Sequence, residues 1–147
     1  MKLRYKRLPT KEFFSIYSKV PRLCIDALIK GPRGIVLAKR DIEPWKGMWH
    51  IPGGTVMIGE KLESAVTRIV LGETGLKVRI KKSIGVIEYI ILHKGKRFHA
   101  VSMVFLVSPV GGALHGSRAG KEIQYFKHIP HRIIKEQKKF LDRLKRK

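Results

Sequence analysis

Apolar residues recur at steps of three and four between Glu60 and Gly72, which is the spacing of an amphipathic helix. Pro52, Gly53 and Gly54 precede this segment and predict a tight turn. Gly75 follows it at the position where a glycine commonly ends a helix. Residues 50–76 are therefore predicted to form a loop, a helix and a second loop, with apolar helix positions at Leu62, Ala65, Val66, Ile69 and Val70.

Strand-like runs rich in branched apolar residues lie on both sides of that helix. They cover residues 23–30, 35–40, 77–92 with a break at Gly85, 98–107 and 122–127, with a hairpin turn at 94–97. Two further helices are predicted, one within residues 8–20 with Thr10 as its N-cap and a basic one over 130–146. Four glycines between Pro109 and Lys121 predict a flexible loop. These elements predict an α/β sandwich.

The length of 147 residues and a hydrophobic fraction of 44% predict one globular domain over residues 1–147. Within it we expect a leader helix in 1–21, the loop-helix-loop stretch in 52–76 and the basic C-terminal helix in 130–147. No apolar run is long enough to cross a membrane, and the basic start at residues 1–6 precedes no apolar core. We therefore expect a cytoplasmic protein with no membrane partner. Cys24, within an apolar run, is expected to be a buried thiol.

The net charge is +21, from 32 basic and 11 acidic side chains. Such a charge attracts polyanions, including nucleotides, nucleic acid and anionic lipid. The basic residues are spread along the chain, and no basic motif interleaved with aromatic residues is present. We therefore favour a solvated basic surface, and we expect any nucleic-acid binding to be non-specific.

Seven positions around the central helix have a fixed register. Five residues separate Gly54 from Glu60, and seven separate Glu60 from Arg68. The remaining positions are Val70, Glu73, Gly75 and Leu76. This pattern resembles the Nudix box, the signature of hydrolases that cleave nucleoside diphosphates linked to another group. The resemblance implies a Nudix-type α/β/α sandwich with a mixed sheet.

Three positions on one face of the helix carry carboxylates in most of that family, and here they hold Ile69, Gly72 and Glu73. One carboxylate cannot hold several ions, but it can help hold one Mg²⁺, which takes waters and substrate phosphate oxygens as further ligands. Mn²⁺ is the alternative ion. The helix-borne general base usual in the family is absent.

This loss of acids is similar to that in the GDP-mannose mannosyl hydrolase branch, where water attacks the sugar carbon and GDP leaves. The resemblance implies metal binding by Glu73 and the carbonyl of Gly53. It also implies substrate contacts from Gly54, Asp26 and Arg40, with Arg40 facing the leaving diphosphate. From the residues alone, Asp26 within an apolar run must be paired or hydrogen-bonded, so a structural and a functional role are equally open. Arginine suits bidentate phosphate contact.

Glu60 and Arg68 complete the expected catalytic set, as a pair that holds the loops in place. Thr55 stands where the branch has a phosphate-binding arginine, which Thr cannot replace. The branch's base is a histidine before the last strand, and residues 120–124 hold none. Glu122 is the candidate base or a second metal ligand. Gln124 and His115 are the amide and imidazole alternatives.

The predicted function is Mg²⁺-dependent hydrolysis of a nucleotide sugar such as GDP-mannose, giving nucleoside diphosphate and sugar. Two alternatives stay open. One is a Nudix pyrophosphatase that attacks phosphorus in a nucleotide sugar or a nucleoside triphosphate. The other is a non-catalytic Nudix-fold module that binds RNA or a nucleotide, against which the retained Glu60, Arg68 and Glu73 count. The leader helix could exchange between subunits of a homodimer.

Overall fold

The computed structural model describes residues 6–146 of the chain. Within them lie three helices and seven strands. In chain order they are α1 (Thr10–Tyr17), β1 (Arg22–Gly31), β2 (Gly34–Lys39), β3 (Trp49–His50), β4 (Gly53–Thr55), α2 (Leu62–Thr74), β5 (Leu76–His93), β6 (Lys96–Gly112), β7 (Ile123–Phe126) and α3 (Lys135–Lys145).

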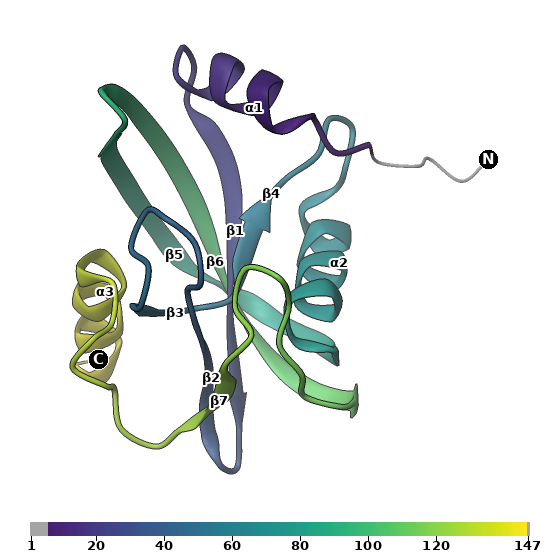
Figure 1. Ribbon diagram of the computed structural model, residues 1–147. Coiled ribbons are helices and arrows are strands. Elements are labelled where there is room, and N and C mark those ends of the chain that lie inside the picture. Colours follow the sequence, from purple (N-terminus) through teal and green to yellow (C-terminus); the bar gives the residue numbers. More distant parts are fainter. Residues whose placement is uncertain (1–5, 147) are drawn as a thin grey trace.

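The strands form a mixed sheet in the order β3-β2-β1-β6-β5, with β4 paired to β1 and β7 paired to β2. The central pair β1 and β6 is parallel, and the other pairs are antiparallel. Figure 1 shows α2 and α3 on opposite sides of the strands and α1 across one end. The α/β sandwich predicted from the pattern is therefore confirmed.

Strand β1 runs through the middle of the sheet, and all of its residues from Cys24 to Ile29 are buried. Two apolar clusters explain this, because one contains Cys24, Leu28 and α3 residues and the other contains Ile25, Ile29 and α2 residues. A strand covered on both faces reads as a continuous apolar run. The predicted burial of the Cys24 thiol is confirmed, and burial raises its pKa to about 11.

Strands β5 and β6 form one long hairpin, and the predicted break at Gly85 is wrong. The strand continues through Gly85, with a register shift between Ser83 and Gly85 and a positive φ of 143° at the glycine. The ring of Phe140 in α3 lies where a side chain at position 85 would project. Strand β6 also extends to Gly112, so the loop predicted from Pro109 begins later.

The box helix α2 begins at Leu62, two residues after the predicted start, and ends as predicted with Gly75 in the left-handed conformation at φ 76°.

The final helix α3 begins at Lys135, not at the predicted residue 130. Trp49 N–H donates to Arg132 O at 2.6 Å and Ile134 N–H donates to Trp49 O at 3.1 Å. These bonds to β3 hold residues 132–134 extended. At α1 the N-cap is Pro9, and no side chain caps the helix; residues 1–5 of the expected leader lie outside the described part.

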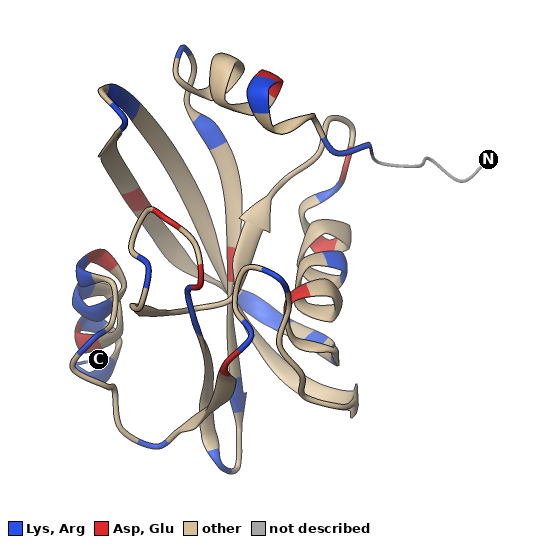
Figure 2. Cartoon of the chain, in the orientation of Figure 1, with Lys and Arg blue, Asp and Glu red and all other residues tan. Residues whose placement is uncertain are grey.

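Lysine and arginine side chains are distributed over all three helices and the strand ends (Figure 2). Basic charge therefore has no single location on the fold. None of the helices in residues 6–146 is both long and apolar enough to cross a membrane.

Candidate active site

The glycine turn before α2 lies directly against β1. Strand β4 pairs with β1 so that Gly53 faces Asp26 and Gly54 faces Ile25. A side chain on Gly53 would collide with Asp26 Oδ1, so the close approach requires glycine there. A Cβ on Gly54 would lie 3.2 Å from the side chain of Ile69. The turn is thus packed between the Asp26 carboxylate and an apolar residue of α2.

Glu60 and Arg68 form the pair that the sequence predicts. Arg68 donates from Nε to Glu60 Oε2 at 2.8 Å and from Nη2 to Oε1 at 3.0 Å. Arg68 Nη2 also donates to Thr55 O at 2.8 Å, and Met57 N–H donates to Glu60 Oε1 at 3.0 Å. The hydrogen bonds from Arg68 hold the pKa of Glu60 below its ordinary value. The pair therefore fixes the loop 55–60 to α2.

A pocket of about 130 Å³ opens beside this turn on the α3 side of the sheet. Its floor is one face of the three neighbouring strands β1, β6 and β5, with β6 in the centre. The walls come from the loop before β3, the glycine turn and α3. The lining residues are Arg22, Cys24, Asp26, Arg40, Trp45, His50, Ile51, Gly53, Gly54, Tyr89, Ile91, Ala100, Ser102, Ile134 and Gln137.

A chain of hydrogen bonds crosses the bottom of the pocket. Tyr89 donates its hydroxyl to Asp26 Oδ2 at 2.7 Å, and Gln137 Nε2 donates to the Tyr89 oxygen at 3.0 Å. Ile51 N–H donates to Gln137 Oε1 at 2.7 Å. Asp26 is thus hydrogen-bonded, as expected of a buried acid, but it has no ion-pair partner within residues 6–146.

Burial raises the pKa of Asp26 to about 6, and the hydrogen bond from Tyr89 opposes this rise. Burial and the neighbouring Asp26 raise the pKa of the Tyr89 hydroxyl. The hydroxyl of Ser102 lies close enough to favour the ionised form of Asp26. Yet no described residue lies within hydrogen-bonding geometry of Ser102 Oγ, although that residue is only 1% exposed. The pocket floor therefore has one buried polar group without a partner.

Arg40 and His50 line the wall near the glycine turn. Arg40 donates from Nε to Pro44 O at 2.6 Å, which fixes its side chain under the loop before β3. Burial, then the positive charge of Arg22, lower the pKa of Arg40. Burial lowers the pKa of His50 to about 4, so its imidazole is neutral at pH 7.

Glu73 is half-buried at the end of α2, and Ser117 Oγ donates to its Oε2 at 2.9 Å. Its negative charge opposes the lowering of the Arg40 pKa, and Arg40 is a residue of the pocket wall. Ile69, the residue at another position of the usual acidic face, is buried against Gly54. Within residues 6–146 no three His, Cys, Asp or Glu side chains form a metal-binding group. This donor set fits one ion completed by phosphate and water, and it does not fit a multi-metal cluster.

The three candidates from the last loop and strand lie outside the pocket. Glu122 is exposed, and its carboxylate lies 3.7 Å from Lys39 Nζ. Gln124 is exposed on β7, opposite Leu37 of β2. His115 is exposed beside Gly75. The position of Glu122 gives no support to its predicted role as the base, because its exposed side chain does not line the pocket.

Sequence reasoning missed five lining residues with polar side chains, namely Arg22, His50, Tyr89, Ser102 and Gln137. A signal for Arg22 was available, because residues 22, 24 and 26 alternate along one strand and share its face. Tyr89 and Ser102 join this face only through the pairing of β6 with β1 and β5. No local pattern predicts that pairing.

The fold and the box geometry together define a protein that carries a glycine turn against the central strand of a mixed sheet, with an Arg–Glu pair holding the loop next to that turn. The sequence profile of the NUDIX domain matches residues 20–144. The chain therefore belongs to the Nudix family.

Similar proteins include two relatives and two solved structures. The ADP-ribose pyrophosphatase of Methanocaldococcus jannaschii is 37% identical over 106 residues, which cover 72% of this chain and 62% of that protein. The low-salt glycan biosynthesis protein Agl8 of Haloferax volcanii is 36% identical over 83 residues, covering 56% and 53%. The chain thus spans less than two thirds of the length of either relative.

The MutT NUDIX hydrolase structure from Burkholderia pseudomallei has a TM-score of 0.72 and 25% identity, covering 84% of this chain and 98% of that one. The MutT protein structure from Methanosarcina mazei Go1 has a TM-score of 0.76 and 22% identity, covering 87% and 95%. These likenesses confirm the Nudix fold.

Proposed function

We propose that this chain is a divalent-metal-dependent hydrolase of a nucleotide sugar such as GDP-mannose, releasing nucleoside diphosphate and free sugar. The observation that carries the proposal is the contact of Ile69 with Gly54. It puts a buried apolar side chain where most of the resembling family has an acid. Gly72 leaves a second such position without a side chain. Glu73 alone cannot gather the ions that activate water against phosphorus.

The residues around the pocket suit this chemistry. Arg40 presents a fixed guanidinium to the diphosphate, a geometry that favours charge-assisted hydrogen bonds. The backbone of Gly53 and Gly54 lies at the same wall and admits close approach of the substrate. Asp26 can accept hydrogen bonds from sugar hydroxyls through the oxygen that Tyr89 does not use. Glu60 and Arg68 act as positioning residues, because they hold the loop next to the turn.

Glu73 and the carbonyl of Gly53 would hold the Mg²⁺ or Mn²⁺ ion that Nudix hydrolases generally use. When bound, the ion supplies positive charge to the diphosphate and makes it a better leaving group. Ser117 orients the Glu73 carboxylate and leaves its Oε1 without a described side-chain partner.

In the proposed step, the oxygen of water forms a bond to the anomeric carbon of the sugar. The bond between that carbon and the diphosphate oxygen breaks, and the electron pair leaves with the diphosphate. Asp26 is the acid side chain that lines the pocket, and its raised pKa makes it a stronger base than an ordinary aspartate. We therefore propose Asp26, in place of Glu122, to accept the proton of the attacking water.

A second candidate function is hydrolysis at phosphorus, giving nucleoside monophosphate and sugar phosphate. The 37% identity to a protein named ADP-ribose pyrophosphatase favours it. The name of the second relative, which refers to glycan biosynthesis, is consistent with a sugar-linked substrate under either chemistry.

Hydrolysis in ¹⁸O-labelled water separates the two candidates. GDP-mannose, other nucleotide sugars and ADP-ribose are incubated with the protein and Mg²⁺, and the products are analysed by mass spectrometry. The proposal predicts label on the free sugar and unlabelled nucleoside diphosphate. Label on a phosphate, with nucleoside monophosphate as product, contradicts the proposal and supports the pyrophosphatase. Nucleotide binding without turnover of any substrate would instead support a non-catalytic module.

A further inference from the structure

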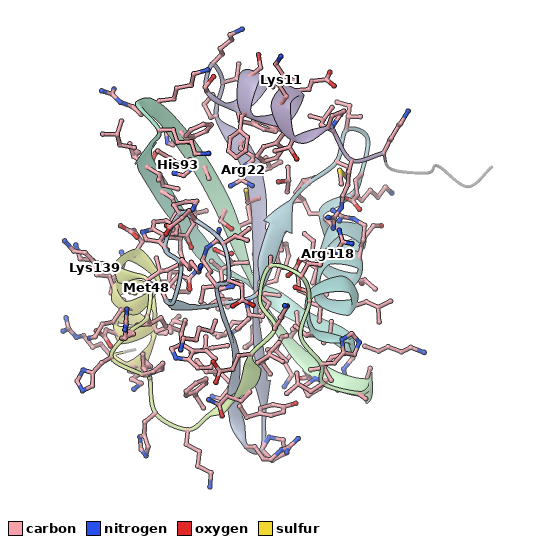
Figure 3. The ribbon with its side chains drawn as sticks, viewed as in Figure 1. Lys11, Arg22, Met48, His93, Arg118 and Lys139 are labelled. Carbon is pink, nitrogen blue, oxygen red and sulfur yellow. The ribbon has the colours of Figure 1, made fainter. Side chains whose placement is uncertain are left out.

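Arg22, the first residue of β1, lines the pocket but has no role in the proposed reaction. It shares one strand face with Cys24 and Asp26, and all three line the pocket. Figure 3 shows Arg22 just below α1, near the end of the sheet that α1 crosses. The residue is half-buried, and its Nη1 donates to Thr55 Oγ1 at 2.9 Å. The guanidinium carbon lies 5.3 Å from the centre of the Phe13 ring in α1. Arg22 is thus held on two sides.

No carboxylate in residues 6–146 forms an ion pair with Arg22 or with Arg40. The two side chains line the same pocket, and the positive charge of Arg22 adds to burial in lowering the pKa of Arg40. Two guanidinium groups near each other, neither of them in an ion pair, repel each other in a half-buried site. An anion between them removes this repulsion and gains charge-assisted hydrogen bonds from both.

The Ser102 hydroxyl lies near the Asp26 carboxylate but makes no hydrogen bond of good geometry within residues 6–146, so it is available to a polar ligand. Ser102 pairs with Cys24 across β6 and β1, so it lies on the floor between Arg22 and Asp26. Buried hydroxyls almost always have a partner, because leaving one without a hydrogen bond is unfavourable. A polar group of a bound ligand would provide that partner.

We propose that Arg22 is a second phosphate-binding residue, which holds one phosphoryl group of a nucleoside diphosphate while Arg40 holds the other. This inference rests on the proposed nucleotide-linked substrate and names the residue that distinguishes diphosphates from monophosphates. The side chain of Thr55, which carries no charge itself, orients Arg22 through the hydrogen bond to Nη1. The positive charge next to the glycine turn therefore comes from the neighbouring strand.

Titration calorimetry with GDP, ADP, GMP and AMP in the presence of Mg²⁺ tests this. Arg22→Ala should weaken binding of GDP or ADP by about tenfold or more, the usual loss for a hydrogen-bonded charge, and should weaken the monophosphates less. Arg22→Lys keeps the charge without the planar fork and should fall between wild type and Arg22→Ala. Arg33→Ala is the matched control, since Arg33 also stacks on an aromatic ring, 4.4 Å from the centre of Tyr125, but lies outside the pocket.

The double variant Arg22→Ala/Thr55→Arg is a second test, in which the guanidinium lost at position 22 is supplied from position 55. It returns a guanidinium to the glycine turn from position 55 and should regain most of the lost diphosphate affinity. The thermal unfolding midpoint of each variant checks that it is folded. Affinities of Arg22→Ala equal to those of Arg33→Ala, or an equal loss for mono- and diphosphates, would overturn the inference and leave the proposed function standing. Failure of the wild type to bind any diphosphate would overturn both.

Discussion

Tyr89 donates a 2.7 Å hydrogen bond to the buried carboxylate of Asp26, and this bond joins β5 to β1 across the intervening strand β6. Gln137 of α3 donates to the same hydroxyl, so the tyrosine oxygen has both a donor and an acceptor. The pocket floor and the helix that covers it are therefore connected through one phenol group.

Tyr89→Phe should destabilise the protein. The change leaves Asp26 without its donor and Gln137 without its acceptor while the ring packing is kept. Loss of buried hydrogen bonds of this kind costs about 1–3 kcal/mol of unfolding free energy. Chemical denaturation measures it, with Tyr125→Phe as the control because the Tyr125 hydroxyl makes no hydrogen bond within residues 6–146. Equal stability of the two variants would show that the bond contributes nothing.

Asp26 should make the folded protein less stable as pH rises from about 4 to 6. Its pKa is 3.8 in the ordinary case and about 6 here. In this window the folded protein keeps a proton that the unfolded chain has lost, so stability is full below pH 4 and falls as pH passes through 6. The shift corresponds to roughly 3 kcal/mol. Asp26→Asn should abolish this fall, as measured by denaturation at a series of pH values.

His50 should act in the opposite direction. Its pKa is lowered from 6.5 to about 4 by burial, so between these values the unfolded chain binds a proton that the folded protein does not. Stability from this group therefore rises with pH over the same range. The wild type combines both slopes, whereas Asp26→Asn should show the rise alone and His50→Gln the fall alone. Parallel pH profiles for the two variants would contradict both assignments.

Glu60→Gln should destabilise the loop before α2. It leaves Arg68, which is 30% exposed at its side chain, facing an uncharged group. The expected loss is about 2–3 kcal/mol, below that of a fully buried pair. Asp142→Asn breaks the exposed pair with Lys138 and serves as the control, for which little change is expected. If both variants unfold at the same denaturant concentration as the wild type, the loop is held by other contacts.

Glu73→Gln should abolish metal-dependent activity with little loss of stability. Glu73 is the carboxylate left on the metal face of α2, and a glutamine can still accept the hydrogen bond from Ser117. Activity is measured across a Mg²⁺ titration with GDP-mannose and ADP-ribose. Glu63→Gln, at the exposed start of the same helix, is the matched control. Near-normal activity at limiting Mg²⁺ would remove Glu73 from the metal site.

The parts of the structure that depend on residues close together in the chain could be predicted from the sequence. The box helix, its end at Gly75 and the Glu60–Arg68 pair all lie within one short stretch. The start of α3 could not be predicted, because the backbone of Arg132 and Ile134 forms hydrogen bonds with the backbone of Trp49, which is distant in the sequence. The pocket could not be predicted either, since Ser102 and Tyr89 lie near Asp26 only when β6 pairs in parallel with β1. Glu122 is a candidate only because it stands in the region where the resembling branch has its base, and its pairing with Lys39 requires the packed strands β2 and β7.

The parallel pairing of β1 with β6 has a consequence for the order in which the chain folds. The hydrogen bonds across the pocket join residues 63 and 86 positions apart, in Asp26–Tyr89 and Ile51–Gln137. Such long-range contacts form late, because the entropy of closing a large loop must be overcome first. A ribosome-bound chain that has completed the box helix has not yet synthesised Tyr89, Ser102 or Gln137. The motif that marks the family is therefore complete well before the pocket it serves, and nucleotide affinity should arise only after α3 leaves the ribosome.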